Sequence, residues 1–454
     1  MPFFLLFDWS WLEISFLIII FVIGLLATSL IIPLVIKFSK KKGYVGIDIH
    51  KNAHPEVPES GGLSLVFGFL IAFIMLMIFF PEYFNKTLIL LLTLILAGFI
   101  GFIDDRVKLR SRYKVLLTIL TGSILYIAYL FSFITISSPI IPFLGKLRLT
   151  VLYPILSPLI IAIFSNIVNM LEGYNGEGSG TCLIALIFIF ICGIIWQSTE
   201  TIIYTIASIG VLIPFFRYNK FPARIFPGDV GTLTMGALLG CIALFGSLEA
   251  AVFCALFIHI FNGFYVLYSV KGFLESSDIQ EKKSDIVLLE DDKIRASYDK
   301  EAALTLPRLI LADGPLTEPE LVFNFYIITI ICGFFSIFTI IMMRWTIGSL
   351  DFSVVIITSI IISILITLIL IKYKRIRGIT YLMILLLIFG YFLLFLIKLL
   401  IIPNITFDII IFYIRIPLNI LISVIIVLPF LSIWYYITIK YFWFKLRKKN
   451  EEFH

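Results

Sequence analysis

The sequence is dominated by long runs of apolar residues, which are interrupted only by short polar stretches. A helix needs about 20 mostly apolar residues to cross the hydrocarbon core of a bilayer, and many of these runs are that long. Only 14% of the residues are charged, whereas a soluble domain usually carries about 25%. The charges are too few to cover a water-facing surface, so we expect an all-α, polytopic integral membrane protein.

We predict about thirteen membrane spans. They are 12–37, 61–80, 87–103, 115–136, 151–170, 181–196, 200–216, 231–247, 248–270, 321–343, 352–371, 379–402 and 409–439. The two short segments 181–196 and 200–216 could instead form one helical pair with a tight turn, or a partly re-entrant element. The first apolar run is too long for the core of a signal peptide, so we expect it to be a retained span.

The basic residues predict the orientation, because Lys and Arg gather in cytoplasmic loops. With the N-terminus outside and the C-terminus cytoplasmic, the inward-facing segments hold 29 of the 35 Lys and Arg residues. The net charge of +6 therefore reflects orientation and does not indicate nucleic-acid binding. We expect a multi-pass protein of the cell membrane, or of the endoplasmic reticulum membrane in a eukaryote, with its functional loops on the cytoplasmic side.

The third predicted span ends in two adjacent carboxylates, Asp104 and Asp105, and five basic residues follow between positions 106 and 114. Neighbouring carboxylates repel each other, and the end of a helix disfavours negative charge. A metal ion or a cluster of phosphate-binding cations would compensate for this arrangement. The alternative is a chance pair of aspartates in a solvated loop beside the membrane.

The fifth predicted span ends with Asn166 and Asn169, which lie three residues apart and so share one helix face. Asparagine is costly at membrane depth and usually faces a polar cavity there. The loop 172–180 that follows is rich in glycine and polar residues, so its backbone can approach a ligand closely. A plain helix end with a flexible turn would not need two asparagines in the preceding helix.

Two further carboxylates adjoin predicted spans. Asp229 stands at the start of the eighth span, where a helix N-terminus favours an anion, although a simple N-cap is the alternative. Glu59 precedes the second span and by itself indicates only a capped helix start. The segment 271–320 is a large loop with 12 acidic and 7 basic residues, which is more typical of a solvated surface than of a site.

Together these motifs resemble those of the polyprenyl-phosphate N-acetylhexosamine-1-phosphate transferases. This family, of glycosyltransferase family 4 type, includes the peptidoglycan translocase and the dolichyl-phosphate GlcNAc-1-phosphate transferases of eukaryotes and archaea. The resemblance covers roughly residues 30–340 and rests on four segments in the family's order, namely 57–62, 104–114, 166–176 and 226–229. We therefore divide the chain into a transferase core, 1–343, and additional C-terminal spans of unknown role, 344–454.

The details favour the dolichyl-phosphate branch. The loop 271–320 contains no histidine, whereas the translocase branch has a histidine-rich motif there, and Asn175 stands where bacterial members tend to have Asp. Two departures leave the sugar open: only Leu306-Pro307-Arg308 resembles the end of that branch's basic stretch, and Ser111 replaces a tryptophan.

The resemblance implies transfer of a sugar-1-phosphate, GlcNAc-1-phosphate in the dolichyl branch, from a UDP-sugar to a polyprenyl or dolichyl phosphate, with release of UMP. It would be the first step of lipid-linked oligosaccharide synthesis for protein N-glycosylation. The implied cofactor is Mg²⁺, or Mn²⁺ in its place, ligated by Asn169 and Asp229. Asp104 and Asp105 would orient or deprotonate the lipid phosphate, and Lys114 would hold phosphate oxygens.

The same resemblance implies a uridine pocket made by Gly173, Asn175 and Phe226. The other residues expected to bind substrate are Glu59, Asn166 and Arg308. The expected partners are the UDP-sugar, the lipid phosphate and the membrane, with no nucleic acid, and a homodimer is left open. The alternatives are the same chemistry with another UDP-N-acetylhexosamine or with undecaprenyl phosphate for cell-wall synthesis, or a membrane transporter.

Overall fold

The computed structural model describes residues 9–147, 149–270, 279, 284–400, 408–411 and 414–451, and these are mostly helical. The long helices are α1 (Trp11–Lys42), α2 (Gly62–Phe79), α3 (Phe84–Val107), α4 (Ser111–Leu130), α5 (Leu152–Leu171), α6 (Glu177–Trp196), α7 (Thr199–Asn219), α8 (Gly228–Gly246), α10 (Phe257–Val270), α13 (Glu318–Thr346), α14 (Phe352–Lys372), α15 (Arg377–Leu400) and α16 (Leu418–Glu451). The short ones are α9 (Glu249–Ala255), α12 (Leu306–Leu311), and the 3₁₀ turns η1 (Pro81–Tyr83) and η2 (Lys374–Ile376).

The described residues are mostly helical, as expected for the all-α class, and small antiparallel sheets join the helices. The pairs are β1 (Val45–Ile47) with β2 (Glu56–Pro58), β3 (Ile140–Ile141) with β4 (Gly145–Lys146), and β8 (Asp408–Ile411) with β9 (Ile414–Pro417). A three-stranded sheet, β5 (Ile286–Leu288), β6 (Lys293–Ala296) and β7 (Leu316–Thr317), lies within the large loop 271–320. The described part of that loop is therefore folded.

Eleven of the described helices are long and apolar enough to cross a membrane, and the bent pair α9–α10 raises the count to as many as twelve. The chain is thus a multi-pass membrane protein. The predicted count of thirteen, and the predicted orientation, remain predictions. The last predicted span, 409–439, overlaps α16, but its start is the hairpin β8–β9. The parts of the predictions that fall on 271–278, 280–283, 401–407 and 412–413 lie outside the described residues.

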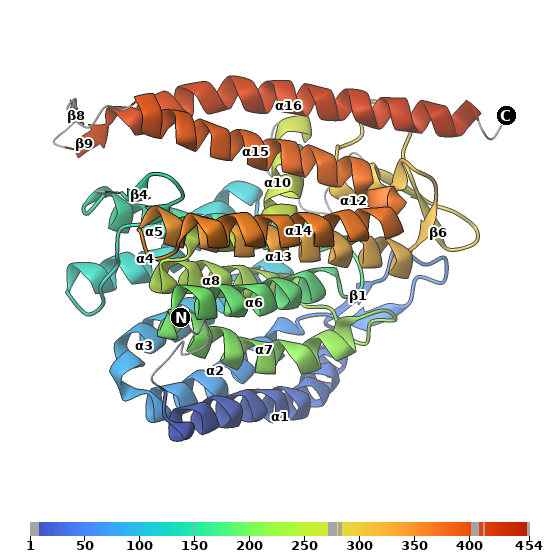
Figure 1. The fold of residues 1–454 in the computed structure, drawn as a ribbon. Coiled ribbons are helices and arrows are strands. Elements are labelled where there is room, and N and C mark those ends of the chain that lie inside the picture. The colour runs from blue at the N-terminus through green and yellow to red at the C-terminus, as the bar shows by residue number, and fades with distance from the viewer. Residues whose placement is uncertain are drawn as a thin grey trace.

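Two of the predicted spans can be refined. The short pair 181–196 and 200–216 forms two separate helices, α6 and α7, and each is long and apolar enough to cross a membrane. The segment 248–270, expected as one span, is bent by 73° between α9 and α10. Asn262 ties α10 to its neighbours, because its amide donates to Met170 O at the end of α5 and accepts from Leu306 N–H. In Figure 1, α10 accordingly runs across the direction of the long helices.

Helix α8 is the most buried of the candidate spans, because 89% of its most apolar 18-residue stretch lies inside the protein. Glycines let its neighbours approach backbone to backbone. A Cβ on Gly62 of α2 would lie 2.0 Å from Gly231 N, and one on Gly101 of α3 would lie 2.4 Å from Asp229 O. On the other side, a Cβ on Gly236 would lie 2.4 Å from Phe164 O of α5. This close packing holds the end of α3 directly beside the first turn of α8.

The long helices run nearly parallel in Figure 1, so the loops gather at two ends. β1 and β6 lie at one end, and β4 and the β8–β9 hairpin lie at the other. An ion pair of 2.6 Å between Lys445 of α16 and Asp313 holds the end of α16 against the folded loop. The end of α16 therefore lies against the described part of the loop 271–320.

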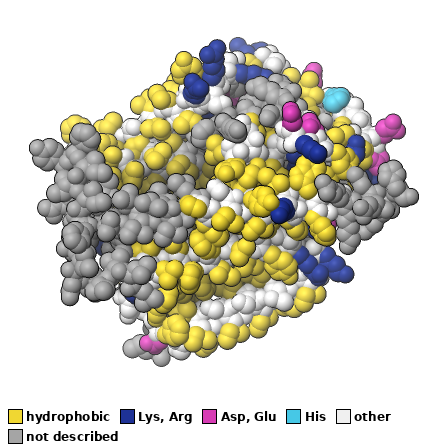
Figure 2. Space-filling view, turned by 90° about the horizontal axis from the view of Figure 1, so that it is seen from above, with side chains coloured by type: hydrophobic (Ala, Val, Ile, Leu, Met, Phe, Trp, Pro, Cys, Tyr) yellow, Lys and Arg dark blue, Asp and Glu magenta, His cyan; other side chains and the backbone are white. Residues whose placement is uncertain are grey.

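The outer surface has the composition that lipid contact requires. On the face seen in Figure 2, hydrophobic side chains cover the middle and charged side chains lie mostly toward the upper and right-hand rim. Large apolar side chains on α1 and α14 are exposed, among them Leu30 (72%) and Leu368 (57%). Such a surface would be unfavourable in water and is favourable against acyl chains.

Candidate active site

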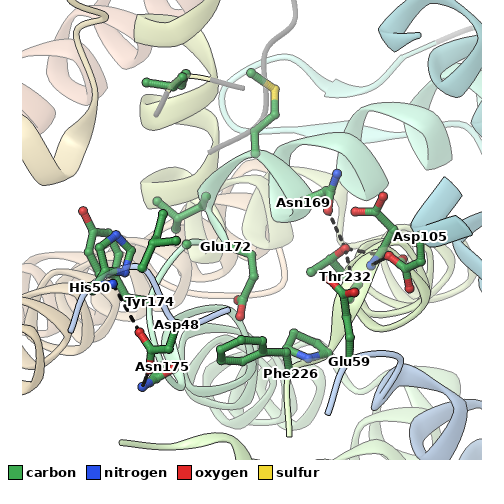
Figure 3. Close-up of a pocket in the computed structure, with 18 of the residues that line it drawn as sticks. Asp48, His50, Glu59, Asp105, Asn169, Glu172, Tyr174, Asn175, Phe226 and Thr232 are labelled. Carbon is green, nitrogen blue, oxygen red and sulfur yellow. Dashed lines mark hydrogen bonds between the residues drawn. The ribbon is translucent and has the colours of Figure 1, made fainter. Parts of the chain in front are cut away.

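A polar cavity of about 410 Å³ opens at the end of the bundle that carries β1 and β6. Its wall comes from seven places: the segment 47–50 from the end of β1, Glu59 before α2, the end of α3, residues 169–175 at the end of α5, residues 226–232 at the start of α8, Asn262 of α10, and the folded loop with Asp285 and Thr305. Figure 3 shows the labelled side chains converging from both sides of the cavity. All four segments that define the family resemblance contribute to the wall, the segment 57–62 through Glu59.

Lys114 links Asp104, a predicted catalytic carboxylate, to Asp229, a predicted metal ligand. Its Nζ lies 2.6 Å from Asp104 Oδ2 and 2.9 Å from Asp229 Oδ2, and the lysine side chain is only 2% exposed. A buried ammonium needs such anionic partners, because its desolvation would otherwise be very unfavourable. The predicted grouping of these three residues is therefore what the structure shows, although they come from α3, α4 and α8.

Asn169 joins this group through its side-chain amide. In the orientation that satisfies all its neighbours, the amide nitrogen donates to Thr232 Oγ1 (2.6 Å) and to Asp229 Oδ1 (2.9 Å). The amide oxygen then accepts from Lys114 Nζ at 2.8 Å. One face of α5 thus meets the first turn of α8, as the position of Asn169 on the helix predicted.

Asp104 and Asp105 are adjacent but have different partners. Asp104 Oδ1 accepts the backbone N–H of Leu109 at 2.7 Å, while Asp105 Oδ1 accepts the backbone N–H of Asp229 at 2.7 Å. Asp105 Oδ2 is buried without a hydrogen-bond partner among the described residues. Gly228 makes this approach feasible: its φ is +61°, and a Cβ there would lie 2.5 Å from Asp105 Oδ2.

These oxygens fit a divalent cation. Mg²⁺ prefers carboxylate and amide oxygens and keeps several water or phosphate ligands, so a few protein oxygens suffice. Asp229 and Asn169 present such oxygens at a helix N-terminus, and the unpartnered Asp105 Oδ2 lies beside the same turn. The donor set therefore fits the metal that the motifs imply.

The predicted uridine-binding residues form the neighbouring wall of the cavity. Phe226 is half-buried, and a Cβ on Gly46 would lie 3.3 Å from its ring. Gly173 and Asn175 lie across from it in the turn that follows α5, as Figure 3 shows for Asn175. Glu59 also lines the cavity, and burial raises its pKa although Arg106 and Lys108 oppose that rise.

Two predicted substrate-binding residues do not reach the cavity. Asn166 donates to Thr118 Oγ1 (2.8 Å) and to Ala162 O (2.7 Å), which fastens α5 to α4. Arg308 is 2% exposed, and its guanidinium donates to backbone carbonyl oxygens of the same folded loop. The accepting residues are Ser297, Asp299, Ala302 and Ala303. The N–H groups of Arg308 are therefore used in hydrogen bonds within the loop, which stabilise its fold. Its neighbour Pro307 lines the cavity.

The structure adds cavity residues that the sequence did not single out. His50 stacks on Tyr174 with ring centroids 4.3 Å apart, and burial lowers its pKa to about 4, so the imidazole is neutral at pH 7. Glu172 accepts the backbone N–H of Gly178 at 2.6 Å, and burial raises its pKa to about 8. Burial likewise raises the pKa of Asp285 to about 6. Glu172 adjoins a predicted span end, whereas His50 and Asp285 lie inside predicted loops with no sequence signal of their own.

A second cluster of acidic and imidazole groups lies on the far side of the turn. The candidate ligand atoms of Asp48, His50 and Glu318 are all within 4.8 Å of one another, and all three residues are buried. By geometry alone this group could hold a metal ion. Its partners, described below, indicate another role.

Comparison with known proteins agrees with this geometry. Residues 87–247 match the model of glycosyl transferase family 4. A Sulfolobus acidocaldarius protein, provisionally named as a UDP-N-acetylglucosamine–dolichyl-phosphate N-acetylglucosaminephosphotransferase, is 35% identical over 241 residues, or 51% of this chain and 72% of the relative. A provisionally named glycosyltransferase of Methanocaldococcus jannaschii is 32% identical over 297 residues, covering 64% and 86%.

Bacterial proteins are also similar. The phospho-N-acetylmuramoyl-pentapeptide-transferase of Clostridium beijerinckii is 31% identical over 230 residues, which cover 48% of this chain and 67% of the relative. The matches to relatives cover most of those proteins, and the family match includes Asp104, Asp105, Lys114, Asn169 and Asp229. The chain belongs to glycosyl transferase family 4.

Proposed function

We propose that the protein transfers N-acetylglucosamine-1-phosphate from UDP-N-acetylglucosamine to dolichyl phosphate or a related polyprenyl phosphate. An oxygen of the lipid phosphate attacks the sugar-linked phosphorus of the UDP-sugar, the bond from that phosphorus to the bridging oxygen breaks, and UMP leaves. The product is a lipid diphosphate sugar. Its further use as the first intermediate of lipid-linked oligosaccharide synthesis is part of the proposal.

One observation carries this proposal: a cationic and carboxylate cluster adjoins a glycine-rich turn and an aromatic ring in one cavity. Lys114 lies between Asp104 and Asp229 within 2.9 Å of each. Phosphoryl transfer needs charge neutralisation and alignment more than covalent help from the protein. A phosphate group at this cluster and a nucleotide on the Phe226 side would place the diphosphate between them.

The carboxylates would have distinct tasks. Asp105 is anchored through Oδ1 and keeps Oδ2 without a hydrogen-bond partner in the described structure. That oxygen can orient the lipid phosphate or accept its proton, since general bases act through such a directed lone pair. Asp104 holds Lys114 in place, and the lysine ammonium would hold phosphate oxygens.

Asp229 and Asn169 would hold a Mg²⁺ or Mn²⁺ ion. When bound, the ion would neutralise charge on the diphosphate and orient its oxygens. Thr232 supports this arrangement, because its hydroxyl lies 2.6 Å from the Asn169 amide and fixes the direction of that side chain.

The assignment of the acceptor rests on the relatives and on position. The Sulfolobus relative carries dolichyl phosphate in its name. The cavity lies where apolar helices end, so a lipid headgroup at the membrane surface could reach Asp105 while its chain stays among the helices. The similarity to the Clostridium transferase favours one second candidate, a muramoyl-type donor with a bacterial polyprenyl phosphate.

The decisive experiment supplies the purified full chain in detergent with UDP-N-acetylglucosamine, Mg²⁺ and dolichyl phosphate and measures UMP release. Release is expected, and it should stop when the lipid phosphate is omitted or replaced by the corresponding alcohol. Parallel reactions with undecaprenyl phosphate and a UDP-muramoyl-pentapeptide test the second candidate. Absence of UMP with every pair, together with transport of lipid-linked sugar across proteoliposomes, would contradict the transferase proposal.

A further inference from the structure

The turn after α5 uses up its own hydrogen-bond donors before any ligand arrives. The backbone N–H groups of Gly173 and Tyr174 both donate to Glu177 Oε2, at 3.1 and 3.2 Å. The backbone N–H of Asn175 donates to Glu318 Oε1 at 2.7 Å. A glycine-rich turn beside a phosphate site often presents N–H groups to its ligand. Here two carboxylates have taken these three N–H groups.

The side-chain amide of Asn175 is committed in the same way. Its Nδ2 donates to Asp48 Oδ2 (3.0 Å) and to Glu318 Oε2 (3.3 Å). Burial raises the pKa of Glu318 to about 7, so the ion-paired Asp48 sets the direction: its carboxylate only accepts hydrogen bonds, and the amide nitrogen of Asn175 therefore faces it. Within the described structure no hydrogen bond to Asn175 Oδ1 is formed, and Asn175 lines the cavity. The side chain can offer a ligand only its oxygen.

Lys51 keeps the two carboxylates together. Its ammonium forms an ion pair with Asp48 and lies 3.8 Å from Glu318 Oε2. Asp48 Oδ1 accepts the backbone N–H of His50 at 3.3 Å. The carboxylate oxygens of this cluster therefore already have N–H or ammonium partners, so we interpret Asp48 and Glu318 as a clamp on Asn175.

We propose that Asp48 and Glu318 determine nucleobase specificity by fixing Asn175 so that the turn presents only hydrogen-bond acceptors. The inference rests on the proposed function, because it assigns the base of the nucleotide donor. An acceptor-only surface selects a base whose edge carries an N–H at the matching position. Uracil carries N3–H, whereas cytosine has a lone pair at N3. If Asn175 Oδ1 faces position 3 of the base, cytosine places its N3 lone pair against an acceptor in a buried site, which is strongly unfavourable, and the N4 amino group could form a bond only if the base shifted.

The clamp makes this selection possible because a free asparagine amide could rotate. With either carboxylate replaced by an amide, Asn175 could turn its nitrogen toward the cavity and accommodate cytosine. Asp48 and Glu318 lie 127 and 143 residues from Asn175 in the sequence, and neither touches the proposed reacting groups. They would act as positioning residues through Asn175.

The first test uses the unmodified full chain in detergent and needs no variant. Dissociation constants for UMP, CMP and 3-methyl-UMP are measured by calorimetry. UMP should bind more tightly than CMP and 3-methyl-UMP by on the order of tenfold or more, since each lacks the N3–H donor. Equal binding of UMP and 3-methyl-UMP would overturn the inference. Failure to bind UMP at all would instead contradict the proposed function.

The second test measures the ratio of CMP to UMP dissociation constants in Asp48→Asn, in Glu318→Gln and in the double variant. The ratio should fall toward one, because the amide of Asn175 is no longer held in one orientation. If the two carboxylates had only a structural role, the variants would bind both nucleotides equally less tightly and the ratio would stay unchanged. That result would overturn the proposal. Glu56→Gln is the matched control, since Glu56 is an exposed carboxylate on β2 of the same loop and should keep the wild-type ratio.

A third variant separates orientation from charge. Adding Asn175→Asp to the double variant supplies an acceptor in either rotamer, so the preference for UMP should return. Persistence of a ratio near one in this triple variant would contradict the acceptor mechanism. Where a variant fails to give monodisperse protein, the single substitutions and the 3-methyl-UMP comparison in the wild type still decide.

Discussion

The backbone N–H of Asp229 donates a 2.7 Å hydrogen bond to the carboxylate of Asp105, across 124 residues of sequence. This bond joins the last turn of α3 to the first turn of α8. A helix C-terminus disfavours the charge of Asp105, whereas the N-terminus of α8 stabilises it. The N-terminus of α8 thus compensates for the unfavourable position of Asp105 at the end of α3, and Gly228 leaves room for the contact.

The first prediction concerns Asp229. Asp229→Asn should lower turnover by roughly a hundredfold or more, because an ion that neutralises phosphate charge is worth several kcal/mol in the transition state. The variant should also require a higher Mg²⁺ or Mn²⁺ concentration for half-maximal UMP release. Asp351→Asn, at the exposed start of α14, is the matched control. Turnover within a few-fold of wild type at saturating Mg²⁺ would remove Asp229 from the ligand set.

Much of this site could be predicted from the sequence, because span counting places the ends of alternate helices on one membrane face. Asp104 and Asp105 end one span, Asn169 ends another, and Asp229 begins a third, so their gathering at one end of the bundle follows from antiparallel packing. Lys114 joins them because it lies one helical turn inside the next span. The order and direction of the spans were therefore enough to predict that these residues lie together.

The remainder could not be predicted, because it depends on contacts between segments far apart in sequence. Arg308 was expected at phosphate oxygens, but the loop around it folds back and surrounds the guanidinium with carbonyl groups. Asp48 and Glu318 are far apart in sequence and are brought together around Asn175 and Lys51. The bonds of Asn262 in α10 to α5 and to α12 likewise join segments far apart in sequence. Apolar periodicity carries no information on such pairings.

The second prediction concerns the Phe226 ring. Phe226→Ala should raise the KM for the UDP-sugar roughly tenfold with a smaller change in kcat, since stacking of one base on an aromatic ring is worth about 1–3 kcal/mol in both ground and transition states. Steady-state kinetics at saturating lipid phosphate measure this. Phe131→Ala, at the exposed opposite end of α4, should behave like wild type. An unchanged KM with lower kcat would place Phe226 outside the nucleotide pocket.

The third prediction is a pH dependence of stability from Glu172. Burial raises the pKa of its carboxyl from 4.5 to about 8, so the folded protein keeps it protonated at neutral pH. The unfolded chain loses that proton near pH 4.5, so stability from this group is full below that pH and is lost as the pH rises toward 8.

Glu172→Gln should remove this dependence. The unfolding midpoint of the variant should therefore rise relative to wild type between about pH 4.5 and pH 8 and then level off. Thermal unfolding in detergent, followed by intrinsic fluorescence across this range, measures the difference. Glu301→Gln, an exposed carboxylate of the folded loop, should track wild type at every pH. A difference independent of pH would show that Glu172 is ionised in the folded protein.

The fourth prediction concerns orientation. Lys41→Cys and Ser349→Cys place exposed thiols at opposite ends of the bundle, in the last turn of α1 and beyond the end of α13. Because the basic loops are expected inside, the first should react with an impermeant maleimide only from the cytoplasmic side and the second only from outside. The five native cysteines are buried, so background labelling should be low. Labelling of position 41 from outside would reverse the topology and put the cavity on the outer face.

The last prediction separates a structural arginine from a catalytic one. Arg308 donates from Nη1 and Nη2 to several carbonyl oxygens and lies over the Phe442 ring, 4.8 Å from its centroid. A lysine has one ammonium and cannot reach these acceptors together, so Arg308→Lys should leave buried carbonyls without partners. The expected cost is about 2 kcal/mol or more in stability, seen as a lower unfolding midpoint. Arg295→Lys, on β6 of the same loop, should cost less, because Arg295 is only half-buried.

At a temperature where the Arg308→Lys protein remains folded, its KM for the UDP-sugar and its kcat should stay within a few-fold of wild type. A loss of kcat by orders of magnitude at an unchanged unfolding midpoint would instead show that Arg308 acts on the substrate phosphates.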